Sequence, residues 1–225
     1  MDVVAAHQGL ADPLRLQMAE SLLQGDLSPS EIGQRWGLST SLVAHHVKCL
    51  VASGIAARTR SEHDGRRWYL TLRRSDPQVV AMVALGLARD AALPTRVVFV
   101  CTRNSARSKL AAAWWRELSE IPALDAGTHP APAPHPLAVE IAAGHGLRID
   151  PTMHQVATTV QPGDLVVAVC DHAHELLPER SSHLHWAIPD PVPAGTRDAF
   201  QHSSENLHAR VSQLSQTLPP DRSTP

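Results

Sequence analysis

The sequence has few aromatic residues, few cysteines and no long apolar run. Aromatic residues make up 4 % of the 225 residues, and the three cysteines, Cys49, Cys101 and Cys170, are too few and too scattered for a disulfide framework. The longest apolar run, residues 79–88, is much shorter than the roughly 20 residues that cross a bilayer. Residues 1–15 lack the basic stretch and apolar core of a secretory signal. We therefore expect free thiols in a soluble, cytoplasmic protein with no membrane partner.

The overall composition suits a folded chain of one or two domains. Hydrophobic residues account for 43 % and charged residues for 19 %, which excludes general disorder. Twenty Lys and Arg residues against 22 Asp and Glu residues give a net charge of -2, which excludes a basic surface over the whole protein. Basic charge is instead local, because six arginines lie between Arg58 and Arg74 against only two acidic residues.

The first part of the chain predicts helices followed by a hairpin. Apolar residues recur at helical spacing over residues 10–23. A second, short helix is predicted over 28–36 and a third over 39–53, separated by a glycine turn. Residues 55–60 and 67–72 flank an Asp-Gly turn, as in a β-hairpin. Two short helices followed by an arginine-bearing hairpin predict a winged helix-turn-helix domain, mainly α with a β-hairpin wing.

This part of the chain resembles the ArsR-type winged-helix repressors. The matching segments are LADPLRLQMAESLL, LSTSLVAHHVKCLVASGI and RRWYLTL. The resemblance implies a recognition helix over 40–53 that binds double-stranded operator DNA. The residues expected at the DNA are Ser39, Thr40, Ser41, His45, His46 and Lys48, with Arg66 and Arg67 in the wing. Hydroxyl groups at a helix N-terminus reach phosphates and base edges, and basic side chains neutralise the DNA backbone. The alternative is a solvated arginine-rich strand and two ordinary surface histidines.

One departure from this family concerns metal sensing. Several of its members sense arsenite through a Cys-x-Cys pair in the helix before the recognition helix, but residues 29–36 contain no cysteine. Cys49 lies near the end of the expected recognition helix and is interpreted as a small buried filler. The usual soft-metal site of this family is therefore missing, and the sequence does not identify the effector.

The segment after Pro77 is apolar nearly all round, which predicts a helix that must be buried. We interpret it as the dimerisation and linker helix of a homodimer, with a lone core helix as the alternative. The predicted organisation is a winged-helix DNA-binding domain over 1–77, a dimerisation or linker helix over 78–94, and a second domain over 95–225.

The second domain begins with a strand, a loop and a helix that together suit a nucleophilic cysteine. Residues 96–101 form a β-branched run typical of a buried parallel strand, which leads into the loop CTRNSARS and then a strong helix former. Loop amides and the helix N-terminus favour a thiolate at Cys101 and bind an anion, while Arg107 offers a planar fork to two oxygens. The expected oxyanion loop is Thr102, Arg103, Asn104, Ser105, Ala106, Arg107 and Ser108. The alternative is a buried cysteine that ends a strand.

CTRNSARS resembles the active-site loop of the low-molecular-weight protein tyrosine phosphatases and of the arsenate reductases that share their fold. The resemblance continues over about residues 96–217, through LDAGTHP, GDLVVAVCD and HWAIPDPVPAGT. It implies an α/β domain with a four-stranded parallel sheet flanked by helices. It also implies that Cys101 is the nucleophile and Asp190 the general acid, while Asn104 and Ser108 hold the loop and stabilise the thiolate.

The residues after Asp190 favour a small substrate. Phosphotyrosine phosphatases of this type line the cleft with aromatic residues there, whereas this chain has Val192 and Pro193, and its only tyrosine, Tyr69, lies in the wing. We therefore expect a thiol-dependent arsenate reductase, acting on arsenate or a phosphate-type oxyanion, fused to an arsenic-responsive regulator. The alternatives are a protein tyrosine phosphatase fused to a regulator and a non-catalytic oxyanion-sensing repressor, although binding alone needs neither the thiol nor the acid.

The electron source is predicted from the remaining cysteines. In thioredoxin-coupled relatives a second cysteine follows the third strand and a third lies seven residues later. Here Cys170 stands at the position of the second cysteine, but the position of the third, seven residues later, is occupied by Leu177. We expect an external thiol reductant, glutathione or mycothiol with a glutaredoxin-like protein, or else a thioredoxin-like system. Cys170 is either a redox partner of Cys101 or a buried strand-end thiol. No bound cofactor and no metal are predicted, because the histidines lack a ligand set and Ala112 replaces an acidic residue near a potassium site of some arsenate reductases.

Overall fold

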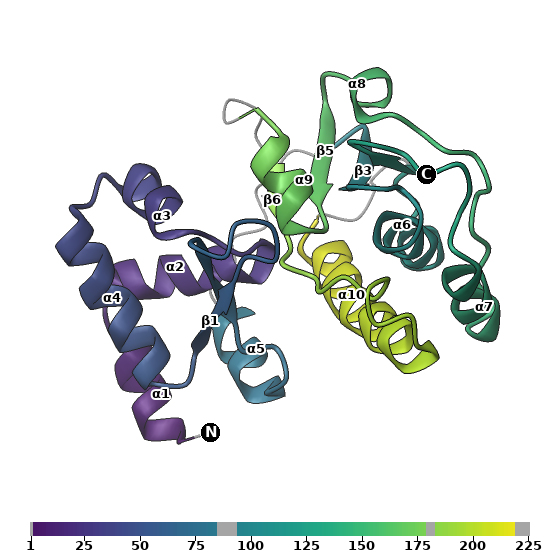
Figure 1. Ribbon diagram of the computed structural model, residues 1–225. Coiled ribbons are helices and arrows are strands. Elements are labelled where there is room, and N and C mark those ends of the chain that lie inside the picture. Colours follow the sequence, from purple (N-terminus) through teal and green to yellow (C-terminus); the bar gives the residue numbers. More distant parts are fainter. Residues whose placement is uncertain (1, 85–93, 179–182, 219–225) are drawn as a thin grey trace, which may run out of the picture. The chain divides into compact units, whose positions relative to one another are not determined.

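The computed structural model describes residues 2–84, 94–178 and 183–218 of the chain. The chain divides into two compact units, Met1–Ala88 and Arg89–Pro225 (Figure 1). Each unit has its own hydrophobic core, and the two are described separately. No helix within the described ranges is both long and apolar enough to cross a membrane.

The first unit contains helices and one hairpin. Its elements are α1 (Val3–Leu10), α2 (Pro13–Gln24), α3 (Pro29–Trp36), α4 (Thr40–Ala52), β1 (Ala56–Arg60), β2 (Trp68–Leu72) and α5 (Pro77–Ala84). Local signals set the helix starts: the side chains of Asp12, Ser28 and Ser39 each accept a hydrogen bond from a first-turn amide. Gly37 ends α3 at a φ of 63°, a left-handed conformation that glycine adopts without strain.

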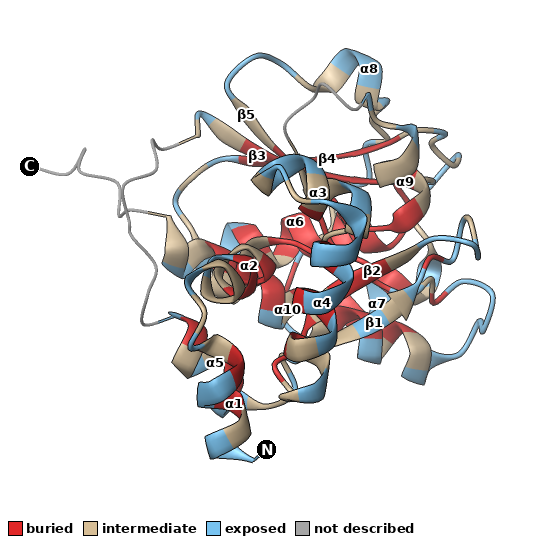
Figure 2. Cartoon of the chain, turned by 90° about the vertical axis from the view of Figure 1, so that its left-hand side faces the viewer, coloured by how far each residue is buried: buried red, intermediate tan, exposed pale blue. Residues whose placement is uncertain are grey.

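The hairpin completes the core of this unit. β1 and β2 are antiparallel, with Ala56 opposite Leu72, and a bridge between Leu27 and Leu70 extends the pairing. Apolar residues of the helices and of the hairpin form one buried cluster, and Figure 2 colours the buried residues red. The expected helix-turn-helix with a small antiparallel hairpin is therefore confirmed.

Two features of the first unit differ from the expectation or fall outside it. Residues 3–10 form a helix that was not predicted, capped by the side chain of Asp2. Of the helix expected over 78–94, the structure describes only Pro77–Ala84, whose Val79 and Val83 are fully buried in the core of this unit. Residues 85–93 lie outside the described residues, and the dimerisation role stays a prediction.

The second unit is an α/β domain. Its elements are β3 (Arg96–Cys101), α6 (Arg107–Leu118), β4 (Ala123–Gly127), α7 (Pro136–Gly144), α8 (Val156–Thr159), β5 (Asp164–Ala168), α9 (Asp171–Leu176), β6 (His183–His185) and α10 (Arg197–Thr217). The four strands are parallel, in the order β4-β3-β5-β6. The expected four-stranded parallel sheet with flanking helices is confirmed.

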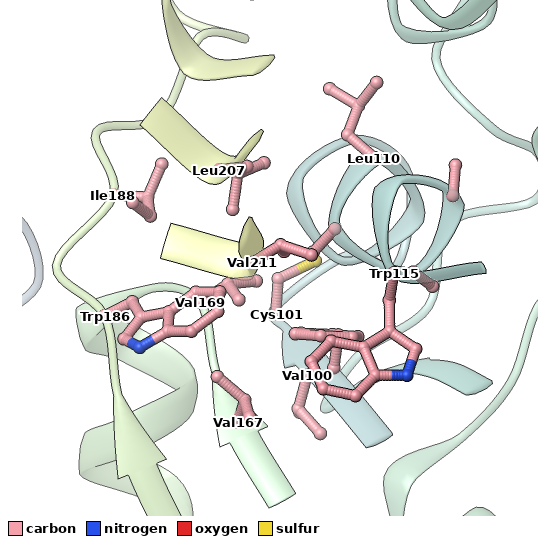
Figure 3. Packing of buried hydrophobic residues seen from close by; sticks show 14 of the residues in the cluster. Val100, Cys101, Leu110, Trp115, Val167, Val169, Trp186, Ile188, Leu207 and Val211 are labelled. Carbon is pink, nitrogen blue, oxygen red and sulfur yellow. The ribbon is translucent and has the colours of Figure 1, made fainter. Parts of the chain in front are cut away.

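The core of the second unit fixes the strand that carries Cys101. β3 lies between β4 and β5, and residues 97–100 are fully buried. The ring of Phe99 packs against those of Trp115 and Trp186 in the buried core, and α6 and α10 pack against each other. Figure 3 shows Trp115 and Trp186 among the buried residues around Cys101. Cys101 is the last residue of β3, at the carboxyl edge of the sheet, where open α/β folds bind their ligands.

Candidate active site

The loop from β3 to α6 encloses the sulfur of Cys101. The Cys101 side chain is buried, the backbone N–H of Asn104 donates to its Sγ at 3.2 Å, and the Ser108 Oγ lies 3.1 Å from the same sulfur. Donors directed at sulfur stabilise the thiolate over the thiol. The arrangement therefore suits a cysteine nucleophile.

Backbone contacts hold the shape of this loop from outside. The carbonyl groups of Cys101, Thr102, Arg103 and Ser105 accept hydrogen bonds from the amides of Thr128, His129, Ala131 and His135, in that order, at 3.1, 2.8, 2.8 and 2.8 Å. Because the C=O and N–H of a trans peptide point in opposite directions, these outward carbonyls direct the amides of the following residues to the inside of the loop, where the Asn104 N–H donates to the sulfur. Amides that converge in this way, next to the N-terminus of α6, form a nest for an anion.

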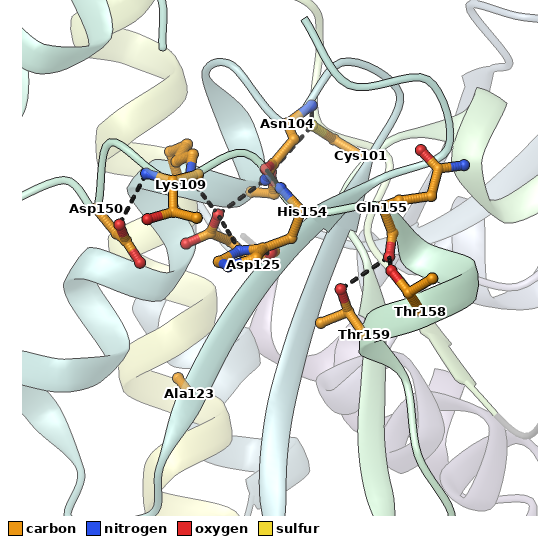
Figure 4. A network of polar contacts seen from close by, with 12 residues as sticks. Cys101, Asn104, Lys109, Ala123, Asp125, Asp150, His154, Gln155, Thr158 and Thr159 are labelled. Atoms are coloured by element: carbon orange, nitrogen blue, oxygen red, sulfur yellow. Dashed lines mark hydrogen bonds and ion pairs between the residues drawn. The ribbon is translucent and has the colours of Figure 1, made fainter. Parts of the chain in front are cut away.

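Asn104 connects the loop to the rest of the site. It is the one non-glycine residue with a positive φ, 50°, within the described residues, a conformation that asparagine tolerates better than most side chains. Its Nδ2 donates to Ser108 Oγ at 3.0 Å and to Asp125 Oδ1 at 2.8 Å, while its Oδ1 accepts from the His154 amide at 2.8 Å (Figure 4). Asn104 and Ser108 thus both contact the Cys101 sulfur and each other, and their expected role in stabilising the thiolate stays a prediction.

Arg107 and Asp190 meet although they are far apart in sequence. Nη2 of Arg107 lies 2.9 Å from Oδ2 of Asp190, and Nη1 donates to the Ile188 carbonyl at 2.9 Å. Arg107 is buried and Asp190 is half-buried, and the Val192 amide donates to Asp190 Oδ1 at 3.2 Å. These contacts orient a guanidinium fork, the group that binds oxyanions in pairs of hydrogen bonds.

Cys170 lies beside the loop. Its Sγ is 3.5 Å from the hydroxyl of Thr102, the residue after the candidate nucleophile, and accepts from the Ala173 amide at 3.4 Å. Burial raises the pKa of the Cys170 thiol above its ordinary value, and the Arg107 guanidinium opposes that effect. Cys170 is therefore placed beside the residue that follows Cys101, with a pKa raised by burial. The other loop residues differ in exposure: Arg103 is exposed and Thr102 half-buried, while Ser105 and Ala106 are buried.

Most of the expected DNA-facing residues share one surface of the first unit. Ser39, Thr40, Ser41, His45 and Lys48 are exposed, and the last three are spaced at i, i+4 and i+7 on α4. Arg66 and Arg67 are exposed near the hairpin turn.

Three further contacts involve residues of α4 and of the hairpin. Arg67 lies 3.6 Å from the Asp64 carboxylate. Cys49, expected to be buried, is half-buried, with its Sγ 3.9 Å from Nε2 of His45. Arg58 stacks over the ring of Trp68 at 4.6 Å, which orients one of the wing's cations.

His46 does not lie on the exposed face of α4. Its side chain is buried, because Val43, Val47 and Leu50 form the inward stripe of α4 and position 46 falls within it. Burial lowers the pKa of His46 below its ordinary value. The expectation that His46 faces DNA was therefore wrong, and the helical spacing of the neighbouring apolar residues was the signal that would have corrected it.

Sequence reasoning also missed a buried ion pair next to the loop, between Lys109 and Asp125. Lys109 follows the CTRNSARS loop directly, and Asp125 lies in the LDAGTHP segment, but neither carries a local signal of burial. For metals, no group of three or more His, Cys, Asp or Glu side chains suited to an ion occurs in the described parts of the chain. The absence of a metal stays an expectation.

Comparison with known proteins agrees with these two units. The model of the low molecular weight phosphotyrosine protein phosphatase family matches residues 96–224, and that of the MarR family matches residues 15–67. An arsenate reductase of Brevibacillus brevis is 30 % identical over 129 residues, which cover 54 % of this chain and 94 % of that protein. An arsenate reductase of Bacillus cereus is 31 % identical over 131 residues, with the same coverage.

Solved structures agree at the level of the fold. The Erwinia amylovora tyrosine phosphatase AmsI superposes with a TM-score of 0.51 and 21 % identity, over 59 % of this chain and 99 % of that one. An arsenate reductase in the phosphate-binding state gives a TM-score of 0.50 and 23 % identity, over 56 % and 99 % of the two chains. The N-terminal match indicates a helix-turn-helix domain but not the ArsR type in particular. The chain belongs to the low molecular weight phosphotyrosine protein phosphatase family, with a helix-turn-helix domain preceding the phosphatase-like one.

Proposed function

We propose that the second unit is a thiol-dependent arsenate reductase and that the first is an ArsR-type, arsenic-responsive regulator that binds operator DNA. One observation carries the enzymatic part: the Cys101 sulfur lies within a loop whose Asn104 amide and Ser108 hydroxyl contact it, next to an oriented Arg107. The curated relatives named arsenate reductase cover this unit. Thiol chemistry on a tetrahedral oxyanion is what this arrangement suits.

The first step joins sulfur to arsenic. The Cys101 thiolate attacks the arsenic atom of arsenate, whose oxygens are held by the loop amides and Arg107, so that an S–As bond forms and an As–OH bond breaks. Asp190 supplies the proton with which the hydroxide leaves as water. In the free enzyme Asp190 is paired with Arg107, and arsenate competes with Asp190 for that guanidinium.

The second step reduces arsenic. A second thiolate attacks the Cys101 sulfur, an S–S bond forms, the S–As bond breaks, and its electron pair reduces arsenate to arsenite. An external thiol, glutathione or mycothiol, supplies that thiolate, and a glutaredoxin-like protein then regenerates Cys101. Cys170 is a second source, because Thr102 links it to the loop, but its raised pKa disfavours the thiolate.

The aromatic residues favour arsenate over phosphotyrosine. Phe99, Trp115 and Trp186 are fully buried in the core, and the residue after the Asp190-Pro191 pair is an exposed valine, Val192. Neither these three core rings nor Val192 offers a phenyl group an accessible aromatic face to stack on. A phosphatase remains the alternative, favoured by the family match itself.

The reductase is tested by measuring arsenite formation with the full chain and a glutathione or mycothiol system. We expect Cys101→Ser to abolish turnover, because a hydroxyl replaces a thiolate poorly, while the control Cys49→Ala, changed in the other unit, keeps it. Undiminished turnover in Cys101→Ser would refute the assignment. Hydrolysis of p-nitrophenyl phosphate without arsenate reduction would favour the phosphatase. Arsenate-dependent DNA binding that survives in Cys101→Ser, with no turnover in the parent chain, would favour the non-catalytic sensor.

The DNA-binding part rests on the exposed face of α4 and the wing arginines. As a twofold homodimer the chain would place two recognition helices in major grooves roughly 10 base pairs apart. On duplexes selected from a random pool, Arg66→Ala with Arg67→Ala should weaken binding to all sequences and make the salt dependence shallower by up to about one unit per lost phosphate contact. Changes at Ser41 or His45 should instead alter sequence preference. An unchanged affinity and salt slope in the wing variant would exclude a DNA wing.

A further inference from the structure

A fully buried lysine lies next to the oxyanion loop. Lys109 is the third residue of α6, its side chain has no exposed surface, and its Nζ lies 2.6 Å from Oδ1 of Asp125, whose side chain is 1 % exposed. The ammonium also donates to the carbonyl of Thr152. Buried charges require partners of this kind, since an unpaired ammonium or carboxylate is strongly disfavoured away from water.

Asp125 is the anchor to which the loop is tied. On β4, the same Oδ1 that contacts Lys109 accepts from Nδ2 of Asn104 at 2.8 Å (Figure 4). Arg116 also approaches this carboxylate, but at 3.4 Å and with a side chain that is about a third exposed. Solvent screens such a partner more than it screens the enclosed Lys109.

Consecutive hydrogen bonds lead from this carboxylate to the reactive sulfur. Asp125 accepts from Asn104, Asn104 donates to Ser108, and the Ser108 hydroxyl contacts Cys101. A carboxylate holds the Asn104 amide more firmly than a neutral acceptor would. Its negative charge, however, would oppose both the thiolate and an incoming oxyanion if nothing balanced it.

Lys109 and Asn104 also hold the segment behind the loop. Lys109 reaches the carbonyl of Thr152, and Asn104 accepts from the amide of His154, so that both contacts hold residues 152–154 against the loop. The lysine is thus placed to balance charge and to keep the anchor in position at once.

We propose that Lys109 is a positioning residue whose enclosed ammonium neutralises Asp125, so that this carboxylate holds Asn104 without opposing the Cys101 thiolate and the bound oxyanion. The inference rests on Cys101 as the nucleophile of the proposed reductase. Within the Lys109–Asp125 pair, the ammonium is the internal counter-ion of the carboxylate that anchors the loop.

The test uses the full chain with Lys109→Met, Asp125→Asn and the double variant. Alkylation of Cys101 by iodoacetamide is followed on its own peptide by mass spectrometry between about pH 6 and pH 9, with and without inorganic phosphate. In Lys109→Met we expect alkylation at neutral pH to slow about tenfold, its pH profile to move to higher pH, and phosphate protection to weaken, because the Asp125 charge is then unbalanced. The double variant should recover most of this loss, since the opposing charge is removed as well.

Two outcomes overturn the proposal: a folded Lys109→Met variant with an unchanged alkylation profile, or a folded double variant as impaired as Lys109→Met, which would make the role of Lys109 one of packing. Circular dichroism checks the fold of each variant. If Lys109→Met fails to fold, the double variant decides; if both fail, the pair serves the fold and the proposal is also wrong. Alkylation and phosphate protection need no arsenate turnover, so failure of the reductase assignment would be seen separately.

Discussion

Replacing Gly127 by alanine should displace the oxyanion loop by steric contact alone. Gly127 is the last residue of β4 and lies opposite Cys101 in the parallel register. A Cβ atom at this position would lie 2.9 Å from the Cβ and N atoms of Asn104 and 2.9 Å from the carbonyl oxygen of Thr102. Gly127 is not among the residues with a positive φ, so its backbone conformation is open to alanine.

The size of the effect follows from these contacts. Ordinary contact with a Cβ begins at 3.4 Å, so the loop and β4 must separate by about half an ångström, and two of the three contacted atoms are backbone atoms that cannot rotate away. Forcing an additional methyl into packed structure costs about 1–3 kcal/mol. Displacement of the loop that holds Cys101 should lower kcat/KM for arsenate by about tenfold to a hundredfold.

The assay compares Gly127→Ala with Gly144→Ala. At Gly144, on α7 of the same unit, an added Cβ meets nothing within 4 Å, so this variant should keep parental activity and stability. Arsenate turnover, phosphate protection of Cys101 and thermal unfolding are measured for both. Unchanged kcat/KM and phosphate protection in a folded Gly127→Ala variant would refute the claim that this close approach fixes the loop.

Two further predictions concern the electron source and pH. Thioredoxin alone should support little arsenate turnover and a small-thiol system more, and Cys170→Ala should change the rate only modestly. Full activity with thioredoxin that is lost in Cys170→Ala would instead show that Cys101 and Cys170 suffice for thioredoxin-coupled reduction. Burial lowers the pKa of His46 in the folded state, so the unfolded chain binds a proton at this imidazole at a higher pH than the folded chain does. The stability of the first unit should therefore decline as the pH falls below about 6.5. His46→Gln should reduce that decline in urea midpoints measured between about pH 7.5 and pH 5.5; an equal decline would exclude His46 as its cause.

Features with local causes could be predicted from the sequence. The starts of α2, α3 and α4 follow from the capping side chains of Asp12, Ser28 and Ser39, which act within one turn. The run of β-branched residues before Cys101 predicts the buried central strand, and the loop that follows predicts a nucleophile beside an anion site. The assignment of Asp190 to the site came from family resemblance, and its contact with Arg107 was not predicted, because their separation along the chain carries no physical signal of its own.

His46 shows a signal that was present and underused. The residues at 43, 47 and 50 define the buried stripe of α4, and a residue one position before Val47 lies within it whatever its polarity. The neighbouring His45 lies on the opposite face of α4 and is exposed. Consecutive residues on a helix are rotated by about 100° around its axis, so His45 and His46 face different directions.

Lys109 could not have been placed in this way, since its burial depends on where β4 lies beside α6. Lysine and aspartate are almost never fully buried unless they are paired, so each is unfavourable in a core by itself and becomes acceptable with the other as its partner. The net charge of -2 is equally uninformative here, because the charges that act on the Cys101 thiolate are the few that solvent does not screen. The electrostatics of this site are therefore a property of tertiary packing, and charge-changing substitutions at Lys109 and Asp125 should outweigh those at exposed positions of α6.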